Sequence, residues 1–252
     1  MSSLGKTASE YDCVRFDHAF PEGVENNYWN IARNRIIAHE IALAGRTGLV
    51  PIRPRILEVG CGPGVVVKHL LDIGMDAWGV DLGMPCPAKG TEGRLFTGIA
   101  ADALPEPYRL SVDCLMLLDV IEHIEDAGAF LRGILASFPN ARAALVTAPA
   151  RPEAWSNFDE YYGHYRRYTM DTLQQELSAC KMTPVRITYF FHSLYFAAMG
   201  IRFARLRRRV ALQPPRNIAF HRGVAAYLWL ENKLLGPLRI VPGLSLLAVA
   251  RR

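Results

Sequence analysis

Residues 56–64, ILEVGCGPG, constrain the fold more than any other stretch of this chain. A short apolar run ends in three glycines spaced by two, Gly60, Gly62 and Gly64. Glycine adopts positive φ angles readily and lets the backbone approach a ligand, while amides at the start of a following helix face that ligand. The pattern therefore predicts a buried strand, a ligand-binding turn and a helix over 65–71.

The spacing around the glycines distinguishes one cofactor class from another. A dinucleotide-binding fingerprint needs G-x-G-x-x-G, but Val65 stands where its third glycine would fall, and Glu58 lies two residues before the first. A second strand over 77–80 ends in Asp81, about twenty residues past the loop, where a carboxylate can accept hydrogen bonds from both ribose hydroxyls. These residues predict a site for a nucleoside-bearing ligand.

This pattern resembles motif I of the Rossmann-like S-adenosylmethionine-dependent methyltransferases, E/D-V-G-C-G-x-G. The resemblance runs from about Trp29 to the terminal SLLAVARR. It implies an α/β fold with a seven-stranded, mostly parallel sheet, and S-adenosylmethionine as the cofactor. The residues that it places against the cofactor are Glu58, Gly60, Cys61, Gly62, Gly64, Asp81, Leu82, Asp102, Ala103 and Asp119.

Hydrophobic periodicity predicts the other elements. Apolar side chains recur at three- and four-residue steps ahead of the first strand, which predicts a lid helix over 26–46. Residues 83–93 are too rich in Gly and Pro for the helix that usually follows the second strand, so they are predicted as a loop. Further strands are predicted over 94–97, 112–118, 141–148, 183–191 and 244–250, and further helices over 127–137 and 170–179. The chain, 1–252, is predicted to be a single domain with a helical insert over 192–241, between the last two strands.

A polar segment, DVIEHIED, follows the apolar run of 112–118. If it is helical, Asp119, Glu122 and His123 lie at i, i+3 and i+4, on one face at the carboxyl end of the sheet. A capped, solvated turn is the alternative. The segment resembles that of a bacterial methyltransferase branch, whose relatives among the small-RNA 2′-O-methyltransferases hold a divalent metal on E-x-x-E-H. Asp119 replaces the first Glu of that motif.

The stretch 147–169 is predicted as a long, aromatic, polar loop on the same edge. Its W-S-x-x-D-E-x-x-G-H-Y-R-R-Y-T pattern resembles the same branch and places His164 where the RNA enzymes have their last metal ligand. A histidine satisfied by a carbonyl is the alternative. The resemblance implies catalysis by His123, His164 and Asp119, as a base or through a divalent metal on Asp119, Glu122, His123 and His164. The residues predicted to contact the acceptor are Tyr28, Trp29, Trp155, Asp159, Arg166 and Tyr168.

Positive charge is concentrated in the last fifth of the chain. The whole chain carries a net charge of +5, whereas residues 200–252 hold eleven Lys and Arg against the single Glu231. The insert over 192–241 combines these arginines with apolar helices over 194–201 and 224–235. It is predicted either to cap the domain or a second copy in a homodimer, or to contact an anionic membrane surface. Nucleic acid is disfavoured because Phe203 alone interleaves with the arginines as a base-stacking aromatic.

The five cysteines are scattered, odd in number and without a C-x-x-C pair, which predicts a reducing compartment. Cys61 and Cys114 stand in apolar or Gly-rich strands, as small hydrophobic residues do. Residues 1–25 contain no apolar region of the kind that signal peptides need, and no apolar run reaches the roughly 18 residues of a membrane span. We therefore expect a cytoplasmic protein, membrane-peripheral if the insert binds lipid.

These features predict an S-adenosylmethionine-dependent methyltransferase that acts on an oxygen, or secondarily a nitrogen, of a small-molecule, sugar or lipid-linked acceptor, in a pathway such as secondary metabolism. Two alternatives remain. The first is an RNA 2′-O-methyltransferase with a metal site, which needs a basic groove near residues 155–168. The second is a non-catalytic scaffold that binds the cofactor without turnover.

Overall fold

The strand that precedes the glycines lies inside a seven-stranded sheet in the computed structural model, which describes residues 18–212 and 214–252. The strand order is β3-β2-β1-β4-β5-β7-β6. Strands β1 to β5 pair in parallel, whereas β7 is antiparallel to both of its neighbours. The strands are β1 (Arg55–Val59), β2 (Asp76–Asp81), β3 (Leu95–Thr97), β4 (Cys114–Leu118), β5 (Ala143–Pro149), β6 (Thr183–Phe190) and β7 (Ser245–Arg251).

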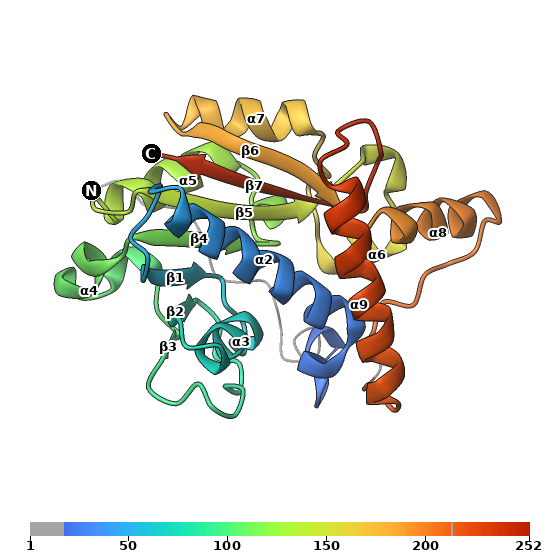
Figure 1. The fold of residues 1–252 in the computed structure, drawn as a ribbon, viewed down its shortest axis with the longest axis horizontal. Coiled ribbons are helices and arrows are strands. Elements are labelled where there is room, and N and C mark those ends of the chain that lie inside the picture. Colours follow the sequence, from blue (N-terminus) through green and yellow to red (C-terminus); the bar gives the residue numbers. More distant parts are fainter. Residues whose placement is uncertain (1–17, 213) are drawn as a thin grey trace.

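The sheet is apolar on both faces because helices cover both. In β4 all five side chains are buried, and they alternate between two hydrophobic cores. Met116 belongs to the core under α2 (Tyr28–Arg46), α3 (Val65–Asp72), α8 (His192–Phe203) and α9 (Ile218–Leu235). Leu115 belongs to the core under α5 (Ala127–Ser137) and α7 (Met170–Ala179) on the opposite face. Figure 1 shows α2 and α9 crossing on one side of the sheet, with α7 along β6.

Shorter helices occupy the connections. These are η1 (Val24–Asn26), η2 (Ala101–Ala103), α4 (Glu106–Ser111), η3 (Ile121–His123), η4 (Pro152–Ala154) and α6 (Asn157–Tyr162). Residues 83–93 contain no helix or strand, as predicted. Where the chain is described, no helix combines the length and apolar character needed to cross a bilayer.

The predicted fold is confirmed, including the seven strands and the helices α8 and α9 between the last two. Several boundaries were wrong because caps, rather than hydrophobic periodicity, decide where helices begin. The lid helix begins at Tyr28, where the Asn27 side chain accepts a hydrogen bond from the Trp29 amide. The stretch 147–169 is not a continuous loop, because Ser156 and Asp159 form a capping box that starts α6. The expectations for Cys13 and for most of the leader region concern residues 1–17, outside the described residues.

Candidate active site

The three glycines of the turn after β1 all adopt positive φ angles, 76°, 53° and 80°. A Cβ atom on Gly60 would lie 2.8 Å from a methyl carbon of Val120, and one on Gly64 would lie 2.8 Å from a methyl carbon of Leu95. The turn is therefore packed against the segment that follows β4 and against the first residue of β3. Phe20, from the N-terminal side, lies over Gly62. Glycine is required here both by the backbone conformation and by the lack of space.

Asp81 holds this turn in place. One of its carboxylate oxygens accepts a hydrogen bond from the Gly62 amide at 2.7 Å, and the other accepts one from the Gly83 amide at 2.7 Å. A carboxylate has about four lone-pair sites, so both oxygens retain capacity for the predicted ribose hydroxyls. Asp81 thus joins the turn after β1 to the end of β2, at the carboxyl edge where open α/β folds bind ligands.

An arginine from the lid helix enters the same edge of the sheet. Arg33 Nη1 donates to Asp119 Oδ2 at 2.6 Å, and the Thr147 hydroxyl donates to Asp119 Oδ1 at 3.1 Å. The Arg33 Nε atom is buried without a hydrogen-bond partner. Sequence reasoning missed Arg33, although a signal existed: it lies four residues from both Trp29 and Ile37, on the apolar face of the helix.

Glu58, like Arg33, has a buried polar atom without a hydrogen-bond partner. Its side chain is 3% exposed, and its Oε2 atom has no hydrogen-bond partner. Burial raises the pKa of Glu58 to about 8; the Arg33 charge opposes this rise, and the carboxylates of Asp81 and Asp119 add to it. Glu58 and Arg33 therefore lie beside the glycine turn, and each has one buried polar atom without a hydrogen-bond partner. They fit the ammonium and the carboxylate of a methionyl group respectively.

Three side chains after β4 and β5 converge as predicted. Glu122, His123 and His164 each offer a ligand atom, and these atoms lie within 4.8 Å of one another. The two imidazole rings meet edge to face, with centroids 4.7 Å apart. Burial and the neighbouring His164 lower the pKa of His123 to about 4, so this ring is neutral near pH 7. The Glu122 Oε2 atom is buried without a partner, so this donor set fits a divalent metal ion.

His164 is oriented by a buried carboxylate. Its Nδ1 atom lies 2.9 Å from Asp159 Oδ1, and Arg167 donates to both oxygens of Asp159 at 2.7 and 3.1 Å. Burial by itself would raise the pKa of Asp159, but the hydrogen bonds from His164 and Arg167 and their charges lower it to about 2. An ionised Asp159 requires a proton on Nδ1, which leaves the Nε2 lone pair of His164 for a proton or a metal. Asp159 is 0% exposed and its oxygens are engaged by His164 and Arg167, so in this structure it positions His164.

Asp119 does not join the predicted metal set. Its φ angle is 56°, so the chain turns sharply after β4 and η3 begins only at Ile121. The predicted helical face of Asp119, Glu122 and His123 is consequently absent, and Asp119 pairs with Arg33 instead. Asp119 remains on the cofactor side of the edge, whereas the other two lie with His164.

Several predicted acceptor contacts have structural roles. Tyr28 stacks on His221 of α9 with ring centroids 5.6 Å apart, which ties the lid helix to the insert. Trp29 packs on Phe191, the residue before α8, with ring centroids 4.4 Å apart. Tyr168 is 2% exposed within the core under α7. These contacts hold the three side chains within the fold, and their contact with an acceptor stays a prediction. The sequence pattern could not separate them from contact residues because aromatic side chains serve both purposes.

Two further residues of the same set form hydrogen bonds that involve backbone carbonyls. The Arg166 guanidinium donates to the carbonyls of Ile124 and Glu125, which fastens the two loops together. The Trp155 carbonyl accepts a hydrogen bond from Arg202 at 2.8 Å. Leu82, Asp102 and Ala103 lie in the connections after β2 and β3, and their cofactor contacts stay predictions.

The sheet order, the glycine turn and Asp81 define a Rossmann-like methyltransferase, the class whose cofactor is S-adenosylmethionine. Residues 28–180 match the family described as "Methyltransferase domain", and the chain belongs to that family. The predicted class and cofactor are thereby confirmed.

Curated relatives and solved structures are similar to this chain at low identity. Ubiquinone biosynthesis O-methyltransferase from Pseudomonas entomophila is 25% identical over 134 residues, 50% of this chain and 54% of the relative. The enzyme of that name from Paracidovorax citrulli is 26% identical over 145 residues, 53% of this chain and 56% of the relative. The chain thus spans about half the length of these relatives.

Among solved structures, a sarcosine dimethylglycine methyltransferase from Galdieria sulphuraria has a TM-score of 0.54 at 13% identity, covering 88% of this chain and 86% of its own. Magnesium protoporphyrin IX methyltransferase from Synechocystis PCC 6803 has a TM-score of 0.52 at 14% identity, covering 97% and 92%. These likenesses establish the fold.

Proposed function

We propose that this chain transfers a methyl group from S-adenosylmethionine to a hydroxyl oxygen of a small-molecule or lipid-linked acceptor. The observation that carries the proposal is the convergence of Glu122, His123 and His164 next to the glycine turn. The two sites adjoin because Val120, three residues before His123, packs on Gly60. The name of the similar ubiquinone enzymes supports oxygen as the acceptor atom rather than nitrogen.

The residues divide the work in a simple way. When bound, S-adenosylmethionine supplies an electrophilic methyl group, so the protein's main tasks are alignment and the removal of the hydroxyl proton. Glu58 and Arg33 would hold the methionyl ammonium and carboxylate, and Asp81 would hold the ribose. His164 accepts the proton on Nε2, and the ionised Asp159 stabilises the resulting imidazolium. A divalent metal on Glu122, His123 and His164 would instead lower the pKa of the hydroxyl.

One experiment distinguishes the mechanism in which His164 is the base from the mechanism that uses a divalent metal. Transfer of labelled methyl from S-adenosylmethionine to extracted small molecules, lipids and RNA is measured for the wild type, for His164→Ala and for the control His69→Ala on α3. We expect His164→Ala to lose about 10²- to 10⁴-fold in rate with binding of the demethylated cofactor intact. Loss of transfer on chelation, restored by added metal, indicates the metal form; insensitivity to chelator indicates the base. Unchanged transfer by His164→Ala would contradict both, and label appearing in RNA alone would favour a 2′-O-methyltransferase.

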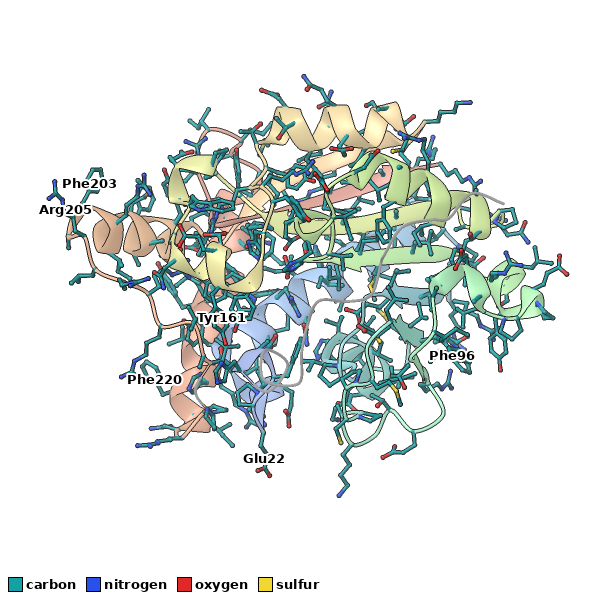
Figure 2. The ribbon with its side chains drawn as sticks, turned by 180° about the vertical axis from the view of Figure 1, so that it is seen from behind. Glu22, Phe96, Tyr161, Phe203, Arg205 and Phe220 are labelled. Atoms are coloured by element: carbon teal, nitrogen blue, oxygen red, sulfur yellow. The ribbon has the colours of Figure 1, made fainter. Side chains whose placement is uncertain are left out.

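We also propose that the insert over 192–241 associates with anionic membrane surfaces, as a cytoplasmic, peripheral protein would. Large apolar side chains are exposed along it, among them Phe203 at 81%, Phe220 at 61% and Ile240 at 90%. Figure 2 places Phe203, the last residue of α8, and Arg205 at one tip of the molecule, with Phe220 on the outer side of α9. Basic residues flanking exposed apolar ones are typical of interfacial helices, and the charge of this region complements anionic lipid.

Co-sedimentation with liposomes of increasing anionic lipid content tests this association. We expect binding to rise with anionic lipid and to fall with salt, and Phe203→Ser with Phe220→Ser to weaken it. Ile52→Ser is the matched control, because Ile52 is 87% exposed but lies outside the insert. If the protein instead forms a dimer in solution that these substitutions dissociate, without binding lipid, the insert is a subunit interface.

A further inference from the structure

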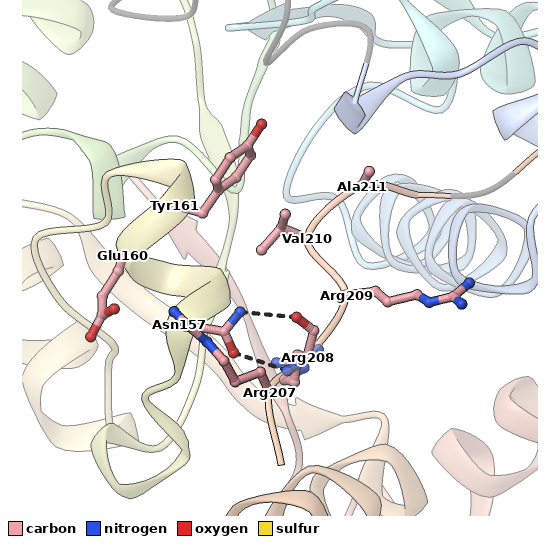
Figure 3. Close-up of a pocket in the computed structure, with 8 residues that line it drawn as sticks. All are labelled: Asn157, Glu160, Tyr161, Arg207, Arg208, Arg209, Val210 and Ala211. Atoms are coloured by element: carbon pink, nitrogen blue, oxygen red, sulfur yellow. Dashed lines mark hydrogen bonds between the residues drawn. The ribbon is translucent and has the colours of Figure 1, made fainter.

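The segment between α8 and α9 is fastened to α6 by specific hydrogen bonds. The Asn157 side chain donates to the Arg208 carbonyl and accepts from the Arg208 amide, both at 2.9 Å (Figure 3). The Tyr162 hydroxyl donates to the Val210 carbonyl at 2.7 Å, and the Leu212 amide donates to the carbonyl of His18 at 2.9 Å. The backbone of this arginine segment, residues 207–211, therefore holds a defined position beside α6.

A cavity of about 700 Å³ lies between α6 and the arginine segment. Arg207, Arg208 and Arg209 line it from the segment, and Asn157, Glu160 and Tyr161 line it from α6. In Figure 3 the Glu160 carboxylate points away from the three arginines. The cavity consequently has an excess of positive charge, because its lining contains three basic side chains and one acidic side chain.

Arg208 is directed toward the candidate active site. Its guanidinium carbon lies 5.0 Å from the centroid of the Phe158 ring, and the same ring meets His164 edge-on at 6.5 Å. Burial and the charge of Arg167 lower the pKa of Arg208, and the charge of Asp159 opposes this change.

Asp159, the carboxylate whose charge acts on Arg208, is already engaged. Asp159 forms its ion pair with Arg167 and its hydrogen bond with His164. Among residues 18–212 and 214–252, no ion pair joins Arg208 to a carboxylate. A half-buried guanidinium without a counter-charge is an unfavourable arrangement for the free protein, and a bound anion would relieve it.

We propose that Arg208, flanked by Arg207 and Arg209, binds an anionic group of the methyl acceptor, a carboxylate or a phosphate. This inference rests on the proposed function, since it assigns the cavity to the same acceptor. The Phe158 ring contacts both Arg208 and His164, and we assign the anionic group and the group to be methylated to different ends of the acceptor. Arg208 would then select among hydroxylated molecules by their charge.

Protection from phenylglyoxal, which modifies accessible arginines, tests the anion site directly. Modification of each arginine in the full-length wild type is followed by peptide mass spectrometry, with and without inorganic phosphate or benzoate as the probe. We expect the saturating probe to slow modification of Arg208 by about tenfold, as a charge-assisted hydrogen bond would, and not to slow that of exposed Arg222 on α9. Protection by phosphate alone indicates a phosphate group, and protection by benzoate alone indicates a carboxylate.

A variant separates binding from folding. Asn157→Ala removes the side chain that holds the Arg208 backbone, and we expect it to lose the protection while calorimetry shows unchanged affinity for the demethylated cofactor. Equal effects of either probe on Arg208 and Arg222, or no protection, would overturn the anion site. Failure of the wild type to bind the demethylated cofactor would instead overturn the proposed function, so the two failures are distinct.

Discussion

Arg33 of the lid helix donates a 2.6 Å hydrogen bond to Asp119, the residue at which the chain turns after β4. The bond joins α2 to the carboxyl edge of the sheet, and the side chains of the pair are 12% and 27% exposed. A half-buried, charge-assisted pair of this kind is stronger than a surface ion pair. It also leaves Arg33 Nε buried without a partner beside the glycine turn.

Arg33→Met should therefore weaken cofactor binding more than it weakens the fold. We expect a loss of about 1.5 to 3 kcal/mol in affinity for the demethylated cofactor, the usual contribution of a hydrogen bond to a charged group. Arg33→Lys keeps the charge without the planar fork and should recover part of the affinity. Calorimetry measures both, and full affinity in Arg33→Met would show that this arginine serves only to hold the lid helix.

Asp81→Ala should disrupt the site in two ways. It removes the acceptor for the Gly62 and Gly83 amides and the predicted ribose contact. We expect a loss of about 2 to 4 kcal/mol in cofactor affinity. The control Asp72→Ala removes a carboxylate at the end of α3, where it pairs with Lys68 on the surface, and should leave the affinity unchanged. Equal affinities of Asp81→Ala and wild type in calorimetry would refute this assignment.

Glu58 should make the free protein less stable as the pH rises. Its pKa is raised to about 8 in the fold, so above pH 4.5 the unfolded chain releases a proton that the folded chain keeps. The stability from this group is complete below pH 4.5 and is lost as the pH rises toward 8, by at most about 1.4 kcal/mol per pH unit. Urea unfolding near both ends of this range measures it. Glu58→Gln should show a smaller decline, and identical declines in both proteins would contradict the raised pKa.

Asp159→Asn should destabilise the fold because it leaves Arg167, which is 7% exposed, without its counter-charge. Removing one partner of a buried ion pair typically costs about 3 to 5 kcal/mol. The double variant Asp159→Asn with Arg167→Met should recover part of that loss, since no buried charge remains unpaired. Chemical denaturation measures the three proteins. If Asp159→Asn is as stable as the wild type, the ion pair between Asp159 and Arg167 does not stabilise the fold.

The sequence by itself determined the class of fold, the cofactor, the glycine turn with Asp81, and the approach of His123 to His164. Apolar runs predict the buried strands. The three glycines predict the turn, because its backbone conformation and its packing both exclude larger side chains. Asp81 and the pair of histidines could be placed at one edge because the carboxyl ends of parallel strands meet there. Those inferences depend on local residue patterns and on the order of the strands, and both can be predicted from the sequence.

Only the tertiary structure decided which side chains meet across distant segments. The left-handed turn at Asp119 separated this residue from Glu122 and His123, and Arg33 arrived from a helix 86 positions away. Asp159, expected to contact the acceptor, became the partner of His164 because Arg167 is buried with it. Arg208 came beside Phe158 because Asn157 binds its backbone. Contacts of this kind depend on how whole helices and strands pack together, so the spacing of residues along the sequence does not predict them.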